Sequence, residues 1–193
     1  MRITGGLARG IILDVPKKGE VRPATDFVRE RIFGRLSAVI QSTHVLDCFA
    51  GTGAYGLEAL SRGAQHVCFL EKDPQVVSVL RNNCEKVCKS LQREVISAVS
   101  IFSVDVFHFD LSRLDLPINY IFFDPPYRFW EEYIVALLGL LEGLAQAFPE
   151  SRMVIEYPSQ FIWTEQMPWE PIYPTQARKK KNAPEINLFR KRQ

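Results

Sequence analysis

The sequence has few of the residues that bind metals or cross-link secreted proteins. It contains three histidines and four cysteines, with no CxxC pair and no Cys/His cluster at the spacing of zinc ligands. The cysteines are Cys48, Cys68, Cys84 and Cys88. We therefore expect neither a metal site nor a disulfide framework, and reduced cysteines are typical of a cytosolic protein.

Long apolar runs are also lacking. The longest fall far short of the roughly 20 residues that a membrane-spanning helix requires. The N-terminal stretch MRITGGLARG has no apolar signal core. A soluble cytoplasmic protein without membrane contact is expected, and we expect it to be a monomer.

Charge is nearly balanced over the whole chain, at +2, but it is unevenly distributed. Residues 1–36 carry eight Lys/Arg and four acids, residues 37–175 carry nine and seventeen, and residues 176–193 carry seven and one. Basic ends around an acidic centre suit a surface that meets a polyanion such as nucleic acid. Solvated tails produce the same distribution in many proteins.

From about residue 45 onward, predicted strands alternate with predicted helices. Apolar runs predict strands at 45–50, 67–71, 95–104, 120–124 and 153–157, and helical periodicity predicts helices at 54–63, 74–89 and 130–148. Strands without internal alternation, separated by helices, indicate an α/β fold with a mostly parallel sheet that is covered on both faces.

Two regions lie outside this alternation. Residues 169–175 and 185–192 predict two late strands, joined by the basic loop 177–184. Residues 1–40 predict an N-terminal extension, a short hairpin-like piece followed by a helix from Asp26 to Ile40. With 193 residues and 47% hydrophobic composition, the chain is expected to form one domain that includes this extension.

A glycine-rich stretch, GTGAYG, follows the first predicted strand. Gly51, Gly53 and Gly56 match the pattern G-x-G-x-x-G between a strand and a helix, where glycines allow the backbone to approach a ligand closely. Glu71 ends the next strand twenty residues after Gly51, where a carboxylate can accept both hydroxyls of a ribose. The pattern fits either a dinucleotide or S-adenosylmethionine.

Asp47 distinguishes these two cofactors. An acid four residues before Gly51 would repel a pyrophosphate, whereas it would attract the ammonium and sulfonium of S-adenosylmethionine. The stretch DCFAGTG, which includes Phe49, therefore favours S-adenosylmethionine. Asp105 follows the third strand and is a candidate for binding the adenine amino group. Each acid also has a purely structural interpretation. Asp47 could be a buried residue hydrogen-bonded to the loop, Glu71 could end a strand at the surface, and Asp105 could be an ordinary turn acid.

The stretch FFDPPY, residues 122–127, suggests the chemistry. Asp124 ends a strand at the carboxyl edge of the sheet, and a residue before proline is held extended. Pro125 and Pro126 have carbonyls but no N–H, so the turn is rigid and only accepts hydrogen bonds. Such a turn suits the exocyclic amine of a nucleobase, with Tyr127 stacked on the base. A proline turn beside a core aromatic residue is the structural alternative.

DPPY is one form of the [DNS]-PP-[YFW] motif of methyltransferases that act on the amino groups of nucleobases. The chain as a whole resembles the bacterial small-subunit ribosomal RNA guanine-N2 methyltransferase family, RsmD. The resemblance rests on RITGGLARG at 2–10, RPATDFVRERIF at 22–33, VLDCFAGTGAYGLEALSRGA at 45–64, FLEKD at 69–73 and FFDPPY at 122–127.

This resemblance implies a Rossmann-like methyltransferase sheet with a reversed C-terminal hairpin and S-adenosylmethionine as cofactor. It implies N2 methylation of one guanine in 16S rRNA, within an assembled or assembling 30S particle. It also implies that RPATD borders the active site, where Arg22, Thr25 and Arg29 contact the substrate. Arg29 on a solvated helix face, and Asp26 as an ordinary helix N-cap, are equally compatible with the sequence.

The basic run at residues 178–181 is a candidate for binding the RNA backbone through Lys180, although a solvated loop has the same composition. Two other functions remain open. DPPY also serves DNA adenine-N6 methyltransferases, but the chain has no room for a separate target-recognition domain. A noncatalytic RNA-binding protein could keep the fold, but the acids Asp47, Glu71 and Asp124 are intact.

Overall fold

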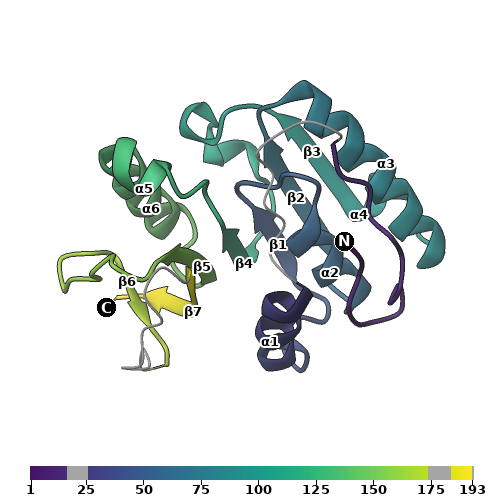
Figure 1. Cartoon of the computed structure of the whole chain (residues 1–193), viewed down its shortest axis with the longest axis horizontal. Helices are drawn as coiled ribbons and strands as arrows, with labels where there is room; N and C mark the ends of the chain where they lie inside the picture. The colour runs from purple at the N-terminus through teal and green to yellow at the C-terminus, as the bar shows by residue number, and fades with distance from the viewer. Residues whose placement is uncertain (17–25, 174–183, 193) are drawn as a thin grey trace.

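The computed structural model describes residues 1–16, 26–173 and 184–192. Its centre is a seven-stranded sheet with the strand order β3-β2-β1-β4-β5-β7-β6. All neighbours from β3 to β5 are parallel, and β7 is antiparallel to both β5 and β6. The strands are β1 His44–Asp47, β2 His66–Glu71, β3 Val99–Ser103, β4 Ile118–Phe123, β5 Arg152–Pro158, β6 Trp169–Pro171 and β7 Pro184–Lys191. This topology confirms the predicted α/β fold with a reversed C-terminal hairpin (Figure 1).

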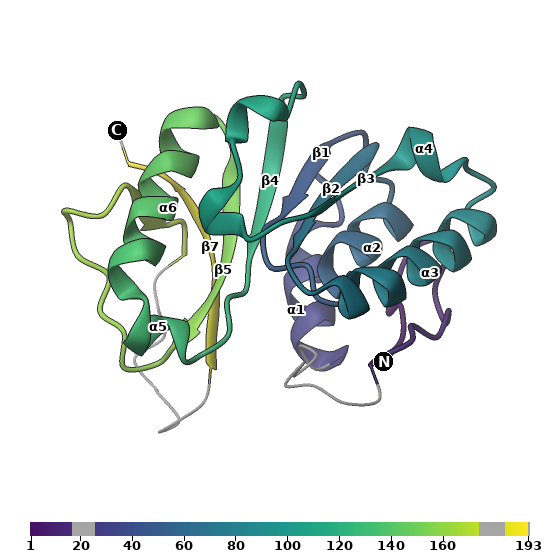
Figure 2. The ribbon, with the colours of Figure 1, turned by 90° about the horizontal axis from the view of Figure 1, so that it is seen from above.

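Helices cover both faces of the sheet, as Figure 2 shows. Residues of α1, α2 and α3 pack in one hydrophobic cluster, and residues of α5 and α6 pack in a second cluster across the strands. The helices are α1 Asp26–Leu36, α2 Ala54–Ser61, α3 Pro74–Ser90, α4 Val95–Ala98, α5 Phe129–Glu132 and α6 Ile134–Ala147, with short 3-10 turns η1 Val106–His108 and η2 Leu111–Arg113. The central strands consist mostly of buried apolar residues, as expected for strands that are covered on both faces.

Several predicted elements begin or end at other residues in the structure. The strand expected at 95–104 begins only at Val99, where pairing with Val67 of β2 starts, and the residues before it form α4. The helix expected at 130–148 is interrupted at Tyr133, whose backbone leaves the helical region with φ −126° and ψ 26°. The expected helix end at Ile40 is also too late, since α1 ends at Leu36.

The N-terminal segment packs on α2, the helix that follows the glycine loop. Ile3 and Ile11 are hydrogen-bonded in a small hairpin, with an antiparallel bridge between Arg2 and Ile12. The hydroxyl of Thr4 donates to Glu58 Oε1 of α2 at 2.7 Å. The first residues of the chain are thereby fixed beside the helix that begins at the glycine loop.

The far end of the same segment is tied to the glycine loop itself. Asn83 of α3 accepts a hydrogen bond from the Asp14 backbone N–H at 2.8 Å and donates one to the Thr52 carbonyl at 3.0 Å. Asn83 is fully buried, so these bonds replace the water that its amide would otherwise bind. One side chain therefore joins the N-terminal segment, α3 and the glycine loop.

Candidate active site

The glycine loop between β1 and α2 depends on backbone conformations that other residues rarely adopt. Gly51 has φ 52° and Gly53 has φ 88°, both in the left-handed region. A Cβ at Gly53 would also lie 2.5 Å from Leu80 Cδ1 of α3. The loop is therefore held close to α3.

Asp47, the last residue of β1, is buried beneath this loop. Its Oδ2 accepts a hydrogen bond from the Gly56 N–H at 3.0 Å. The pKa of Asp47 is raised to about 7, chiefly by burial and also by the nearby charge of Glu71, while the bond from the Gly56 N–H partly offsets this rise. The structure thus shows the hydrogen bond between Asp47 and the loop that was the structural interpretation of this acid. The negative charge of nearby Glu71 also favours a cation beside Asp47.

Glu71, at the end of β2, supports the loop from the other side. Its Oε2 accepts from the Gly51 N–H at 2.9 Å, and its Oε1 accepts from the Asp73 N–H at 2.8 Å. Asp73 in turn caps α3, accepting from the Gln75 N–H at 2.8 Å. Each Glu71 oxygen keeps a second lone pair that can accept from a ribose hydroxyl, and this contact stays a prediction.

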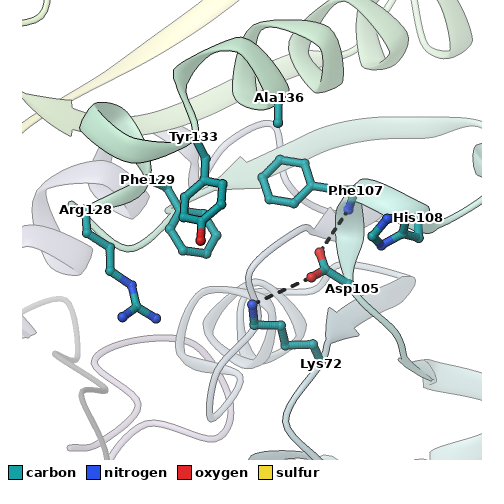
Figure 3. Close-up of a pocket in the computed structure, with 8 residues that line it drawn as sticks. All are labelled: Lys72, Asp105, Phe107, His108, Arg128, Phe129, Tyr133 and Ala136. Atoms are coloured by element: carbon teal, nitrogen blue, oxygen red, sulfur yellow. Dashed lines mark hydrogen bonds and ion pairs between the residues drawn. The ribbon is translucent and has the colours of Figure 1, made fainter.

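A cavity of about 340 Å³ opens beside Asp105, beyond the ends of β2 and β3 (Figure 3). Asp105 Oδ1 accepts from the Phe107 N–H at 3.2 Å, and Oδ2 lies 3.6 Å from Lys72 Nζ. The cavity is lined by Lys72, Asp105, Phe107, His108, Arg128, Phe129, Tyr133 and Ala136. Of these the sequence singled out only Asp105, because the others carry no motif and meet only after folding.

Phe49 lies in an aromatic cluster next to this cavity. Its ring makes edge contacts with Phe107, Phe123 and Phe129, at centroid distances of 6.3, 5.2 and 6.2 Å. Two of these partners, Phe107 and Phe129, also line the cavity. Phe49 therefore links the glycine loop to the cavity wall, which is consistent with its predicted place in a cofactor site.

The DPPY turn lies next to the glycine loop because β4 and β1 are neighbours in the sheet. Asp47 pairs with Phe122, so the chain reaches Asp124 two residues further along the adjacent strand. Asp124 is half-buried, and its pKa is raised well above the usual range by burial first, then by the charges of Glu156 and Asp47. The carboxylates of Glu156 and Asp47 are therefore close enough to raise the pKa of Asp124.

The two prolines of the turn differ in exposure and in role. Pro125 is buried, whereas Pro126 is exposed and its carbonyl accepts from the Phe129 N–H at 2.8 Å. The Pro126 carbonyl therefore stabilises the start of α5, and its contact with the substrate stays a prediction. The corresponding role of the Pro125 carbonyl remains a prediction.

Tyr127 does not project freely from the turn. Its ring packs against the cluster around α5 and α6, and its hydroxyl donates to Glu156 Oε1 at 2.5 Å. The predicted stacking on a base remains a prediction. Glu156 of β5 was not identified from the sequence, because it lies in an ordinary apolar strand, VIEY, and its partners are distant in the chain.

Arg29 does not fit the prediction of a contact with RNA phosphate. Its side chain is fully buried, with Nη2 2.5 Å from Asp26 Oδ1 and 2.7 Å from the Arg2 carbonyl. Its Nη1 lies 3.6 Å from Glu58 Oε2 of α2. Neither RNA binding nor a solvated helix face describes this arginine, which instead joins α1 and the N-terminal segment to α2.

Three other predicted substrate contacts, Arg22, Thr25 and Lys180, lie outside the described residues. In the described parts of the chain, no group of three or more His, Cys, Asp or Glu residues is arranged to hold a metal ion. Over the same residues, no helix combines the length and apolarity needed to cross a membrane.

Comparison with known proteins agrees with this architecture. The family model described as conserved hypothetical protein 95 matches residues 1–188. Ribosomal RNA small subunit methyltransferase D of Escherichia coli K12 is 41% identical over 156 residues, which cover 81% of this chain and 74% of that protein.

Solved structures share the fold. The structure of yhhF from Escherichia coli, a methyltransferase candidate by its description, has a TM-score of 0.74 at 30% identity and covers 99% of this chain and 97% of that one. An RNA methyltransferase from Salinibacter ruber, in complex with S-adenosyl-L-homocysteine, has a TM-score of 0.55 at 15% identity, covers 86% and 90% of the two chains, and shows the fold alone.

The sheet order and the glycine loop at its carboxyl edge define a Rossmann-like class I methyltransferase. Within that class, the chain belongs to the RsmD family. The resemblance seen in the sequence is thereby confirmed.

Proposed function

We propose that this protein transfers a methyl group from S-adenosylmethionine to the exocyclic N2 amine of one guanine in 16S rRNA, within an assembled or assembling 30S particle. The observation that supports it best is the adjacency of two strand ends. The glycine loop after β1 and the DPPY turn after β4 leave neighbouring strands, and the charge of Asp47 contributes to the raised pKa of Asp124. A cofactor site and an amine-accepting turn therefore share one edge of the sheet.

The residues of this edge fit a cationic cofactor. Asp47, Asp124 and Glu156 form a group of acids, and the pKa values of Asp47 and Asp124 are raised by burial and by neighbouring negative charge. A ligand carrying an ammonium and a sulfonium would relieve this unfavourable charge, whereas a pyrophosphate would increase it. The charge of the site therefore supports S-adenosylmethionine over a dinucleotide.

Each part of the cofactor has a candidate partner. Asp47 and the glycine loop would hold the methionine part, Glu71 the ribose hydroxyls, and Asp105 the adenine amino group in the cavity beside Phe107. When bound, S-adenosylmethionine supplies an electrophilic methyl group on its sulfonium.

Asp124 would act on the nucleophile. The lone pair of a nucleobase amine is delocalised into the ring, so the nitrogen is a poor nucleophile until its geometry changes. A hydrogen bond from the amine to the Asp124 carboxylate, and a second one to the Pro125 carbonyl, would favour the tetrahedral nitrogen. Asp124 would then stabilise the positive charge that develops on nitrogen and accept its proton.

The substrate assignment rests on the family. The Escherichia coli relative is named as a small-subunit ribosomal RNA methyltransferase. The choice of guanine N2 over other amines comes from the resemblance carried by the DPPY turn and the N-terminal motifs.

The experiment is methyl transfer from isotopically labelled S-adenosylmethionine to three substrates that lack the modification: 30S particles, naked 16S rRNA and adenine-containing duplex DNA. Mass spectrometry of the digested nucleosides should find the label in N2-methylguanine of the rRNA. Label in N6-methyladenine of DNA would favour the alternative of a DNA methyltransferase. Cofactor binding without transfer to any nucleic acid would favour a noncatalytic RNA-binding protein.

A further inference from the structure

Glu156 of β5 contacts both halves of the site. Its Oε1 accepts from the hydroxyl of Tyr127 in the DPPY turn at 2.5 Å, and its Oε2 accepts from the hydroxyl of Tyr55 at 3.3 Å. Tyr55 is the second residue of α2, directly after the glycine loop. A single carboxylate thus joins the turn proposed for the substrate to the helix that carries the cofactor loop.

The position of Glu156 is an unusual one for a carboxylate. Its exposed fraction is 9%, and it lies in the central part of β5, where Val154, Ile155 and Tyr157 are buried as well. A buried carboxylate is costly unless hydrogen bonds compensate it. The two tyrosine hydroxyls provide such bonds, so the carboxylate and the two hydroxyls orient one another.

Tyr55 is itself fixed by packing. Its ring stacks on Phe122 of β4 at a centroid distance of 5.1 Å and an interplanar angle of 15°. Because Phe122 lies two residues before Asp124, the stacked pair sets the position of the strand end that carries the reacting acid. The bond from Tyr55 to Glu156 extends this support from β4 to β5.

We propose that Glu156 is a positioning residue for methyl transfer, which holds the Tyr127 side of the active site in register with the Tyr55 side. This inference rests on the proposed function, since it assigns a role in the same reaction. Without the Glu156 carboxylate, Tyr127 in the DPPY turn and Tyr55 in the helix after the glycine loop would lose the hydrogen-bond acceptor that they share.

Glu156 also affects the charge state of Asp124. The ionisable groups that act on Asp124 are Glu156 from β5 and Asp47 from β1, and Tyr55 of α2 lies in the same acidic group. Glu156 therefore keeps the pKa of Asp124 high, and a more basic carboxylate accepts a proton from the reacting amine more readily.

The test compares Glu156→Gln with Glu165→Gln, the same change at an exposed position after β5. Gln keeps the shape of Glu156 but removes its charge and one acceptor. Since a misplacement of about 1 Å can cost on the order of a hundredfold in rate, we expect Glu156→Gln to lower kcat between ~10-fold and ~100-fold. The Kd of S-adenosylmethionine should change far less, and Glu165→Gln should match the wild type.

A pH profile separates positioning from mere stability. With the Glu156 charge removed, the pKa of Asp124 falls, so the acid limb of kcat should move to lower pH. In the ligand-free protein, a carboxyl ¹³C NMR titration of Asp124 should show the same downward shift. An unchanged titration together with an unchanged kcat would overturn the proposal.

Tyr127→Phe provides the second variant, because it removes only the hydroxyl that Glu156 accepts. If the two residues act as a unit, the double variant Tyr127→Phe/Glu156→Gln should lose little more kcat than either single variant. Fully additive losses would contradict a shared role. Wild-type protein is assayed in parallel: absence of transfer by the wild type would refute the proposed function, and the NMR titration would still test the link between Glu156 and Asp124.

Discussion

The two halves of the site hold their carboxylates by different means. On the β1 and β2 side, Asp47 accepts from the Gly56 N–H, and Glu71 accepts from the Gly51 and Asp73 N–H groups. On the β4 and β5 side, Glu156 is held by two tyrosine hydroxyls, and Asp124 is influenced by other acids. The backbone N–H donors are present whenever the loop has its folded conformation, whereas each side-chain donor can be removed by a single substitution.

This difference suggests that one half of the site binds the cofactor and the other half controls transfer of the methyl group. A cofactor that is the same in every turnover suits a half whose acids are held by backbone N–H groups, since side-chain substitutions leave these donors in place. The half that meets the nucleobase depends on side chains whose hydrogen bonds set both geometry and basicity. Mutations should therefore separate binding of the cofactor from transfer of the methyl group.

The largest expected effect belongs to Asp124→Asn. Asn keeps the size of the side chain but cannot take the proton of the amine, so transfer should fall by about 10²- to 10³-fold, as for the loss of one preorganised electrostatic contact in an active site. The Kd for S-adenosylmethionine, measured by calorimetry, should stay close to that of the wild type. Asp115→Asn, at an exposed position before β4, is the matched control. If Asp124→Asn lost affinity for S-adenosylmethionine as strongly as it lost methyl transfer, the two halves of the site would not have separate roles.

Gly56→Ala should weaken the backbone-held half. An added Cβ would lie 2.3 Å from Phe69 Cε1 of β2, so α2 must shift and with it the N–H that Asp47 accepts. Overpacking of this kind costs about 1–3 kcal/mol of unfolding free energy, measurable by urea titration. Gly139→Ala in α6 meets no atom within 4 Å and should be neutral or stabilising. A Gly56→Ala protein of unchanged stability would show that α2 does not pack on β2 as described.

The pH dependence of stability should carry the signature of Asp47. Its pKa is raised in the folded protein to about 7, so the folded state holds a proton that the unfolded state has released. The free energy of unfolding should therefore decrease as pH rises from about 4 to about 7, by at most ~1.4 kcal/mol per pH unit for one proton. In Asp47→Asn this component should vanish.

Asp110 offers a control with the opposite sign. Its pKa is lowered by hydrogen bonds from Ser112, so its contribution to stability is present at neutral pH and lost as the pH falls. Because Asp110 is exposed, Asp110→Asn should alter the pH profile only slightly, and only at its acidic end. If Asp47→Asn left the pH dependence of the free energy of unfolding between pH 4 and 7 unchanged, Asp47 would not be buried as described.

The smallest effect is expected for Lys72→Met. The ion pair of Lys72 with Asp105 is partly exposed, at 54% and 32% of the two side chains, so its loss should change stability by less than ~1 kcal/mol. Thermal denaturation measures this directly. A loss of several kcal/mol would show that the cavity beside Asp105 depends on a side-chain contact, as the β4 and β5 half does.

Much of the backbone-held half could be predicted from sequence because its signals are local. Gly51 and Gly53 mark a loop that needs left-handed backbone, and Asp73 before Pro74 marks the helix N-terminus that the structure confirms. Glu71 and Gly51 lie twenty residues apart, within one strand–loop–helix–strand unit, so their proximity follows from the topology.

The side-chain-held half could not be predicted in the same way. Glu156 lies 29 residues from Tyr127 and 101 from Tyr55, and nothing in VIEY distinguishes it from a strand residue facing solvent. Arg29 is similar, because its burial depends on Glu58 of another helix. Long-range pairs of polar side chains leave no periodic trace, so only the packed structure shows them.

The most direct test of the central claim is a crystal structure of the protein with S-adenosyl-L-homocysteine. We expect its adenine in the cavity beside Asp105 and Phe107, its ribose at Glu71, and its sulfur facing Asp124 across the glycine loop. A ligand bound at the glycine loop with the Asp124 carboxylate turned away from the sulfur, or covered by other side chains, would contradict the account.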